Sequence, residues 1–353
     1  MVCRIRSLLL LTVSFLLMAG PARACGGLIS SNGTVQLVDT TTMAAYHDGV
    51  EHYVTAFKFV GPGAAFGSIV PLPDVPTKVI KAGRWTLQRL EIEVSPPRFE
   101  AVALDSGAAA SGKAQVILTA KVDALDITVL KGGGAAVGTW ARQHGFELTP
   151  DAPQVLDFYA KRSPIFAAVK FDAARARQQG VNIGDGTPVH FVIPTDRPWV
   201  PLRILALGAK GVQPIEADVF LLTGERPSLL PVPNGYASPG PVAPGLSVKE
   251  SEPASRLLLG DLRSDRGMGW LPSSGMWLTF LRLDAKAANL TYDLAIDPTG
   301  QGHTSAVDAG LAAPTTSTSG SSSPVWPLVL IATLGAAALV AVARGRGRAR
   351  PAL

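Results

Sequence analysis

The chain has 353 residues, of which 47% are hydrophobic and 17% are charged, with 32 basic and 27 acidic side chains. Seven of the basic residues lie in two terminal segments that contain no acid, so the rest of the sequence holds 25 basic and 27 acidic residues. Nucleic-acid-binding proteins normally carry a marked excess of basic residues, which this balance excludes for the main body of the chain. We therefore expect no nucleic-acid partner.

Residues 1–24 have the pattern of a secretory signal peptide. Two arginines precede an apolar run, Leu8–Met18, whose 11 residues are too few to span a bilayer. Ala22 and Ala24 then supply the small residues that a signal peptidase recognises. This pattern predicts that the protein is exported and that the mature chain begins at residue 25.

Cys25 is the first residue after the predicted cleavage site, and the only other cysteine, Cys3, leaves with the signal peptide. An unpaired cysteine in an exported protein suggests a lipid modification, an intermolecular disulfide or a free thiol. A lipoprotein signal usually has an aliphatic residue three positions before the cysteine and a small residue two before. Ala22 and Arg23 occupy those positions here, so a plain N-terminal thiol is favoured while lipidation and intermolecular pairing stay open.

The first part of the exported region shows the two-residue periodicity of β-strands. Residues 53–60 ("YVTAFKFV") alternate in this way, and Asp48–Gly49 before them is typical of a two-residue hairpin turn. Alternation also predicts strands at 90–94 ("LEIEV") and 125–130 ("LDITVL").

Two helices are predicted in the middle of the chain. Residues 135–145 repeat apolar side chains at helical spacing and end at Gly145, where a left-handed C-cap belongs. Residues 149–163 repeat the spacing, with prolines at the start where a missing N–H costs little. A strand at 165–171 follows. The local order is therefore strand, helix, helix, strand.

Further strands are predicted toward the C-terminus. Residues 190–194 and 202–208 read as strands joined by a proline-rich corner, and residues 276–283 and 289–296 read as a hairpin. Residues 227–245 contain so much proline and glycine that we expect a long loop or linker. Together these patterns predict an α+β fold dominated by antiparallel strands, with residues 226–311 packing on the same domain as residues 25–225.

The C-terminal end has the pattern of a membrane anchor. Residues 325–343 are 19 uncharged, mostly apolar residues, enough to cross the hydrocarbon layer as one helix. The arginine-rich segment 344–353 follows, and positive residues remain on the cytoplasmic side. Residues 312–324 are a Ser/Thr/Gly spacer. We expect a single-pass protein in the cell membrane, with the domain outside and the C-terminus in the cytoplasm.

Several segments carry a family resemblance. "ACGG" at the mature N-terminus, residues 66–76 ("FGSIVPLPDVP"), residues 125–171 and residues 188–209 together resemble the bacterial family called Domain of Unknown Function 2330. The resemblance covers roughly residues 25–225. It implies an exported, often membrane-anchored protein, and it implies no activity. This chain lacks the second cysteine that many members have shortly after "CGG", so the resemblance implies no disulfide here.

His47 and His52 are weak candidates for a metal site. They flank the predicted turn, and hairpin pairing places both on one face of the strands, with Glu51 on the other. Two imidazole nitrogens could hold a metal ion, although a third ligand is missing. The alternative is a solvated end of a hairpin.

The remaining candidates have structural interpretations. His144 fits a core or cap position, His190 begins a strand and His303 lies in the flexible tail. The glycine-rich segment 131–138 lacks the Lys-Ser/Thr ending of a phosphate-binding loop and reads as a turn into a helix. Four tryptophans could form a ligand platform, although aromatic residues in strands more often belong to the core: Trp85, Trp199, Trp270 and Trp277. Trp199 lies between prolines, which could hold its side chain outward.

No nucleophile, metal or cofactor motif stands out, and we expect no cofactor. The first hypothesis is a membrane-anchored, extracytoplasmic, non-enzymatic module that binds an envelope protein or polymer. The alternative is a cell-envelope hydrolase with an unrecognised site near His47, His52 and a distant carboxylate. Metal content of the His47→Ala/His52→Ala variant distinguishes the two hypotheses.

Overall fold

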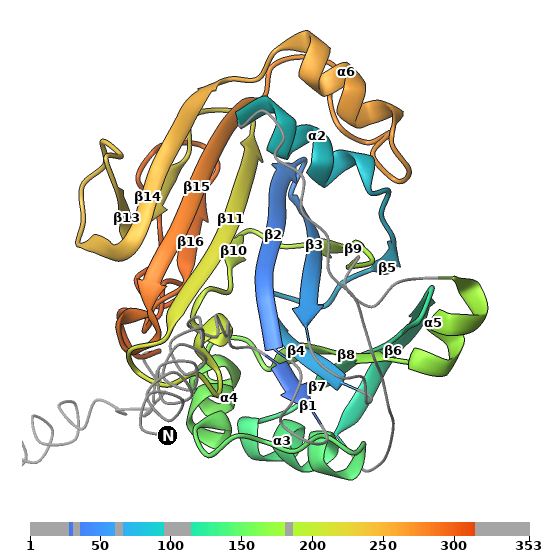
Figure 1. Ribbon diagram of the computed structural model, residues 1–353. Coiled ribbons are helices and arrows are strands. Elements are labelled where there is room, and N and C mark those ends of the chain that lie inside the picture. The colour runs from blue at the N-terminus through green and yellow to red at the C-terminus, as the bar shows by residue number, and fades with distance from the viewer. Residues whose placement is uncertain (1–27, 31–35, 61–65, 95–113, 181–185, 315–353) are drawn as a thin grey trace, which may run out of the picture. The chain divides into compact units, whose positions relative to one another are not determined.

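A computed structural model describes residues 28–30, 36–60, 66–94, 114–180 and 186–314 (Figure 1). Within these ranges the protein is α+β, with three β-sheets and five α-helices. The predicted signal peptide, Cys25 and the predicted membrane helix lie outside the described residues. No helix in the described ranges is long and apolar enough to cross a membrane.

The largest sheet has eight strands in the order β13-β14-β15-β11-β2-β3-β9-β5. Neighbouring strands are antiparallel except for the parallel pairs β2–β11 and β13–β14. The strands are β2 Gln36–His47, β3 Val50–Val60, β5 Lys78–Lys81, β9 Val189–Pro194, β11 Pro214–Thr223, β13 Val232–Asn234, β14 Val242–Pro253 and β15 Trp277–Lys286.

The predicted hairpin at the tip of β2 and β3 is confirmed. His47 pairs with Val50 and Ala45 pairs with His52, which is the register of a two-residue turn. Gly49 has a φ of +77°, a left-handed conformation that glycine adopts at little cost.

A five-stranded antiparallel sheet contains the predicted strand-helix-helix-strand unit. Its order is β1-β4-β8-β7-β6. Helices α3 and α4 follow β7 and pack against each other before the chain enters β8, and the short helix α5 follows β8 (Figure 1). The elements are β1 Leu28–Ser30, β4 Phe66–Leu72, β6 Gln115–Val122, β7 Leu125–Lys131, α3 Gly134–Gln143, α4 Ala152–Ala160, β8 Ile165–Phe171 and α5 Ala173–Gln179.

A small three-stranded sheet, β10-β16-β12, is built mainly from the C-terminal part of the chain. Its strands are antiparallel. Two 3₁₀ helices, η2 and η3, precede β11 and β16. The elements are β10 Trp199–Val200, η2 Arg203–Ala206, β12 Ser228–Leu230, η3 Ala287–Asn289 and β16 Leu294–Asp297.

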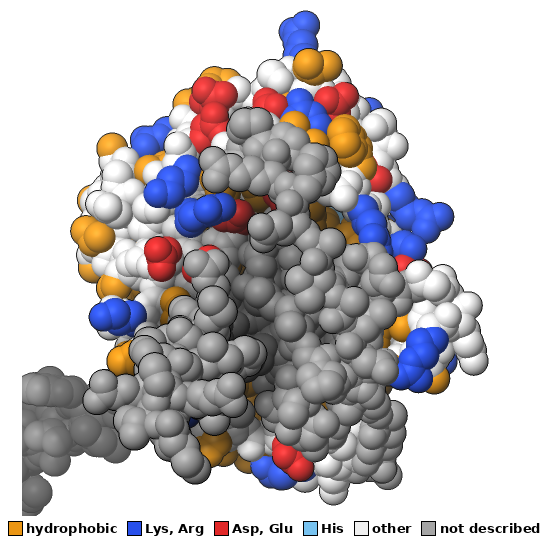
Figure 2. Space-filling model, viewed as in Figure 1, with side chains coloured by type: hydrophobic (Ala, Val, Ile, Leu, Met, Phe, Trp, Pro, Cys, Tyr) orange, Lys and Arg blue, Asp and Glu red, His pale blue; other side chains and the backbone are white. Residues whose placement is uncertain are grey.

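The eight-stranded sheet is apolar on both faces, so two cores form. On β3, Tyr53 belongs to the larger core, which includes the five-stranded sheet, α3, α4 and the three-stranded sheet. The next residue, Val54, belongs to the second core, with Leu87 and Leu90 from α2 (Trp85–Val94) and Leu258 and Leu262 from α6 (Arg256–Ser264). This follows from the alternation of side chains along a strand. Charged side chains with hydrophobic ones between them cover the outer side of α2 and α6 (Figure 2).

The strand predicted at 90–94 is wrong, because these residues form the second half of α2. The decisive contact comes from far along the chain. Asp265 accepts hydrogen bonds from the Thr86 amide (2.6 Å) and the Thr86 hydroxyl (2.7 Å), at the start of the helix. Leu87 and Leu90 are buried while Ile92 is 44% exposed, which is a helical rather than an alternating pattern.

The strand predicted at 202–208 is also wrong, since residues 203–206 form η2. Side chains from elsewhere accept the hydrogen bonds of its amides: Asp293 accepts from Leu202 and Arg203, and the Tyr159 hydroxyl accepts from Ile204. These donors are therefore not available to a strand partner.

The C-terminal strands exist, but they do not form the predicted hairpin. β15 already pairs with β11 on one edge and β14 on the other, so β16 pairs instead with β10 and β12. The expected loop at 227–245 is partly wrong as well. It contains β12, β13 and the start of β14, because edge positions tolerate the prolines of this segment.

Candidate functional site

A buried pair of histidines lies between β3 and β9. His52 Nδ1 and His190 Nε2 are 2.9 Å apart, so one ring donates a hydrogen bond to the other. The strands are antiparallel neighbours in which His52 faces Val192 and Val54 faces His190, which places the two rings diagonally on one face. The indole of Trp270 stacks on His52, with ring centroids 3.4 Å apart and planes 6° from parallel.

Both histidines are neutral at physiological pH. Burial lowers the pKa of His52 to about 3, with further contributions from His190 and His47, and burial lowers the pKa of His190 to about 4. The His190 Nδ1 atom and the Trp270 indole nitrogen are buried without a hydrogen-bond partner among the described residues. The pair and the stacked Trp270 ring connect β3 and β9 with the loop that follows α6.

His47, the other histidine of the predicted metal pair, faces an open hollow. Its Nε2 atom lies 3.3 Å from Asp48 Oδ2, and both side chains are substantially exposed. The hollow has a volume of about 310 Å³ and is also lined by Tyr46, Glu225 and Thr299. His52 hydrogen-bonds to His190 and lies 8% exposed beneath Trp270. Among the residues that the structure describes, no group of three His, Cys, Asp or Glu side chains is placed to hold a metal ion.

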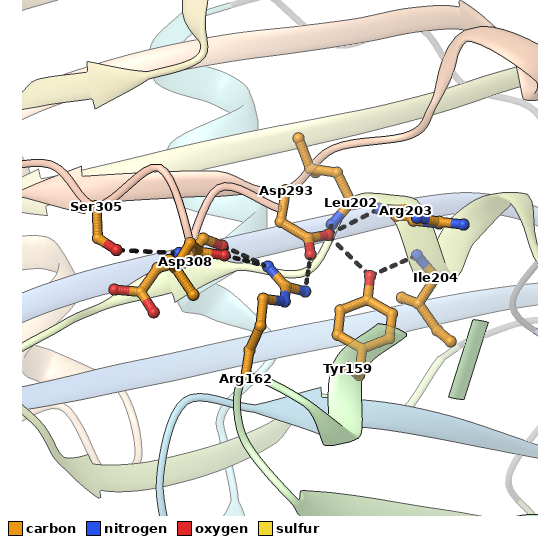
Figure 3. A network of polar contacts seen from close by, with 9 residues as sticks. Tyr159, Arg162, Leu202, Arg203, Ile204, Asp293, Ser305 and Asp308 are labelled. Atoms are coloured by element: carbon orange, nitrogen blue, oxygen red, sulfur yellow. Dashed lines mark hydrogen bonds and ion pairs between the residues drawn. The ribbon is translucent and has the colours of Figure 1, made fainter. Parts of the chain in front are cut away.

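A second polar cluster centres on Asp293, in the larger core (Figure 3). Its Oδ1 atom accepts hydrogen bonds from the Tyr159 hydroxyl at 2.8 Å and from the amides of Leu202 and Arg203 at 2.7 and 2.9 Å. Its Oδ2 atom forms an ion pair with Arg162, and both side chains are almost fully buried. Both oxygens of the Asp293 carboxylate thus have donors, which lowers the cost of burying its charge.

The surroundings of Arg162 complete this cluster. Its guanidinium donates to the backbone oxygen of Asp308 at 2.5 Å and lies over the rings of Phe158, Tyr159 and Trp199 at 4.2, 4.9 and 5.0 Å from their centroids. Burial and the Asp293 charge raise the pKa of Tyr159 well above its usual value. The cluster therefore joins α4, η2 and the C-terminal strands rather than presenting reactive groups to solvent.

Trp199, which the sequence suggests as an outward-facing residue, is instead 2% exposed. Its ring stacks on Tyr159 with centroids 5.9 Å apart. Pairing of Trp199 with Ala295 in the small sheet turns the side chain into the core. A ligand platform that includes Trp199 is therefore not formed.

Glu51, on β3, is a buried carboxyl group. The side chain is fully buried, and neither carboxyl oxygen has a hydrogen-bond partner of normal geometry among the described residues. Burial raises the pKa of Glu51 to about 8, an effect only partly offset by the Trp199 backbone. The carboxyl is therefore largely protonated at neutral pH.

A cavity of about 20 Å³ in the larger core, lined among others by Tyr53 and Thr42, is far too small for an organic ligand.

The other sequence candidates have structural roles. The glycine-rich segment enters α3 as predicted, and a Cβ at Gly134 would lie 2.4 Å from the Asp157 amide nitrogen, so this glycine allows α3 to approach α4. His144 caps α3, with its Nδ1 atom 2.8 Å from the Trp140 oxygen. His303 is not in a flexible tail, because its amide donates to Asp297 in a turn after β16.

The surface offers a different kind of site, which we name the β5–α2 patch: Lys78, Ile80, Arg84, Trp85 and Arg266. Ile80 and Trp85 are 37% and 40% exposed, and the three basic side chains are exposed. The segments are in contact, since the Gly83 amide donates to the Arg266 oxygen at 3.3 Å and Ile80 Cδ1 lies 3.6 Å from the Cβ position of Gly267. Local sequence patterns do not predict this patch, because Arg266 lies 180 residues after Thr86.

The fold defines an α+β protein with two buried polar clusters and with a partly exposed indole near basic side chains at the β5–α2 connection. The chain belongs to the bacterial family described as "Uncharacterized protein conserved in bacteria (DUF2330)", whose model matches residues 19–228. The family resemblance seen in the sequence is thereby confirmed.

None of the curated proteins compared with the chain matches it. Among solved structures, the chain is similar to the crystal structure of baculovirus P35, with 10% sequence identity and a TM-score of 0.37. The similar region covers 75% of this chain and 97% of that one. A TM-score of this size does not indicate a shared fold.

Proposed function

We propose that the protein is an exported, single-pass membrane protein whose domain lies outside the cell membrane and binds another component of the envelope without catalysing a reaction. The signal pattern at 1–24 and the apolar run at 325–343 support this topology. The Ser/Thr/Gly segment between the domain and the apolar run suits a spacer that holds a binding domain away from the lipid surface.

The observation that carries the binding role is the β5–α2 patch. A partly exposed indole lies among cationic side chains at the edge of the large sheet, where a partner can reach them. Tryptophan and arginine are the residues that most often dominate binding energy at interfaces. Within each of the two interior clusters, polar groups hydrogen-bond to one another.

Topology is tested by protease treatment of intact cells stripped of their outer layers, with an epitope tag after residue 353. We expect the domain to be digested while a membrane-bound fragment keeps the tag. Full protection of the domain, or release of the whole chain by alkaline extraction, contradicts the proposal.

Binding is tested in the same cells with a photoreactive amino acid at position 85. We expect a cross-linked adduct to an envelope component that is lost in the Lys78→Glu/Arg266→Glu variant. The matched control places the photoreactive residue at Lys249, an exposed lysine of β14, six strands away from β5 in the same sheet. Equal adduct yields from positions 85 and 249 exclude the patch as the binding surface.

A further inference from the structure

We propose that the β5–α2 patch binds an acidic glycan, a polymer of sugar rings that carry carboxylate or phosphate groups. This assignment rests on the proposed binding function and names its ligand class.

The patch is cationic at short range. Lys78 and Arg266 are exposed cations beside Arg84, and the carboxylate of Asp265, next to Arg266 in the chain, accepts hydrogen bonds from Thr86 and from the Arg266 amide. Lys81, at the end of β5, forms an ion pair with Asp123 at 2.6 Å and adds no net charge. Lys and Arg side chains gather over the β5–α2 connection at the right of Figure 2. Carboxylates and phosphates are the groups such side chains bind most strongly.

The exposed apolar side chains of the patch favour a ligand that contains rings. Trp85 at the start of α2 is 40% exposed, and Ile80 on β5 is 37% exposed. An indole offers a flat apolar surface that packs on the carbon face of a sugar ring. A ligand with charged groups alone would leave this surface in water.

Other polyanions fit less well. A nucleic acid is attracted by a broad positive field, whereas the chain outside its terminal segments has 25 basic and 27 acidic residues. A lipid surface needs apolar side chains that project into it, and the two apolar residues of the patch are each more than half buried. A linear acidic glycan requires only a local group of cations with an aromatic contact, and the β5–α2 patch at the sheet edge combines Lys78 and Arg266 with the exposed Trp85.

The test is direct binding of the full mature chain, purified in detergent micelles. The supporting probes are polygalacturonate and a phosphomannan, and the comparison probes are neutral dextran, inorganic polyphosphate and single-stranded DNA. We expect salt-sensitive binding of one or both acidic glycans and none of dextran. Lys78→Glu/Arg266→Glu is expected to weaken that binding about tenfold or more, because it removes two charge-assisted contacts.

Substitutions of Trp85 distinguish recognition of a glycan from attraction to its charge alone. Trp85→Ala should weaken binding of the acidic glycans, and Trp85→Phe should retain most of it. The matched control Lys249→Glu makes the same charge change at the far side of the large sheet, about 29 Å from β5 at ordinary strand spacing, and should bind like the unmodified chain. If charge reversal lowers the unfolding temperature, the neutral variant Lys78→Gln/Arg266→Gln tests the same contacts.

The assignment is overturned if neither acidic glycan binds, if the patch variants bind as tightly as the unmodified chain, or if polyphosphate or DNA binds equally well. A specific protein adduct from position 85 in cells, together with absent glycan binding, overturns the glycan assignment and leaves the binding function standing. Absence of both removes the binding function as well.

Discussion

Arg162 and Asp293 form an ion pair in the interior of the domain, although 131 positions separate them in the chain. The two side chains are 2% and 0% exposed. The pair joins the loop after α4 to the strand-rich C-terminal region, and Asp293 also holds the amides at the start of η2. The central and C-terminal parts of the chain are therefore linked through one carboxylate.

Asp293→Asn should lower the free energy of unfolding by about 3–5 kcal/mol, because it leaves the Arg162 charge buried without a counter-charge. Urea denaturation of the full chain in micelles measures the change. The control is Asp218→Asn, which removes the partner of the half-exposed Arg282 and should cost about 0–1 kcal/mol. Equal effects of the two substitutions contradict a structural role for the buried pair.

The His52–His190 pair should make stability fall in acid. Both pKa values are lowered in the folded protein, to about 3 and about 4, while an unfolded histidine titrates near pH 6.5. The unfolded chain therefore binds more protons as pH falls below about 6.5, so the stability that is present above that pH is lost toward pH 4. Two such groups contribute a slope of up to about 2.7 kcal/mol per pH unit.

Unfolding free energies of the unmodified chain and of a His52→Phe/His190→Leu variant, measured from pH 7 to pH 4.5, test this expectation. The variant should show a shallower decline across that range. His144→Phe, which changes a histidine outside the pair, serves as the control. Parallel curves for the pair variant and the unmodified chain count against the neutral pair.

Glu51→Gln should raise stability more at pH 8 than at pH 5. Burial raises the pKa of Glu51 to about 8, so the folded protein holds a proton that the unfolded chain has already lost above about pH 4.5. Because the unfolded chain ionises while the folded protein keeps its proton, the free energy of unfolding falls progressively as the pH rises from 4.5 to 8. The side-chain amide of the Glu51→Gln variant does not titrate, so this loss is absent. The gain at pH 8 is on the order of 1–3 kcal/mol after allowing for the buried amide N–H groups. Glu225→Gln, at an exposed position, should show no such dependence.

Two glycine substitutions should act in opposite directions. Gly134→Ala places a Cβ 2.4 Å from the Asp157 amide nitrogen, and the resulting overlap of α3 with α4 should cost about 1–3 kcal/mol. Gly260→Ala, in the middle of α6, meets no atom within 4 Å and should raise stability by about 0.4–1 kcal/mol. Thermal unfolding of both variants decides whether α3 and α4 pack as closely as described.

Local sequence patterns predicted much of the fold because they act over a few residues. The hairpin at Asp48–Gly49 follows from a turn that needs positive φ, and both of its residues have it. The helices near 135–145 and 149–163 follow from apolar spacing, and both are present as α3 and α4. The turn and the two helices depend mainly on residues close to one another in the sequence, so their prediction does not require the tertiary structure.

The candidate sites could be predicted only in part. Hairpin register places His52 on a defined face, but its partner His190 lies 138 positions later, on a strand whose neighbour the sequence does not specify. Trp199 reads as exposed because prolines flank it, yet pairing with Ala295 turns it into the core. The β5–α2 patch likewise exists only because Asp265 and Arg266 meet the start of α2.

The amino-acid sequence by itself therefore determined the family, the α+β class and the local turns and helices, since these depend on short-range sterics and periodicity. Tertiary structure alone decided that 90–94 is helical and 202–208 is not a strand. In each case a distant carboxylate, Asp265 or Asp293, accepts the backbone hydrogen bonds. A buried amide must donate a hydrogen bond to an acceptor that the tertiary structure brings near it. The free energy of that hydrogen bond outweighs the weak secondary-structure propensity of a short segment.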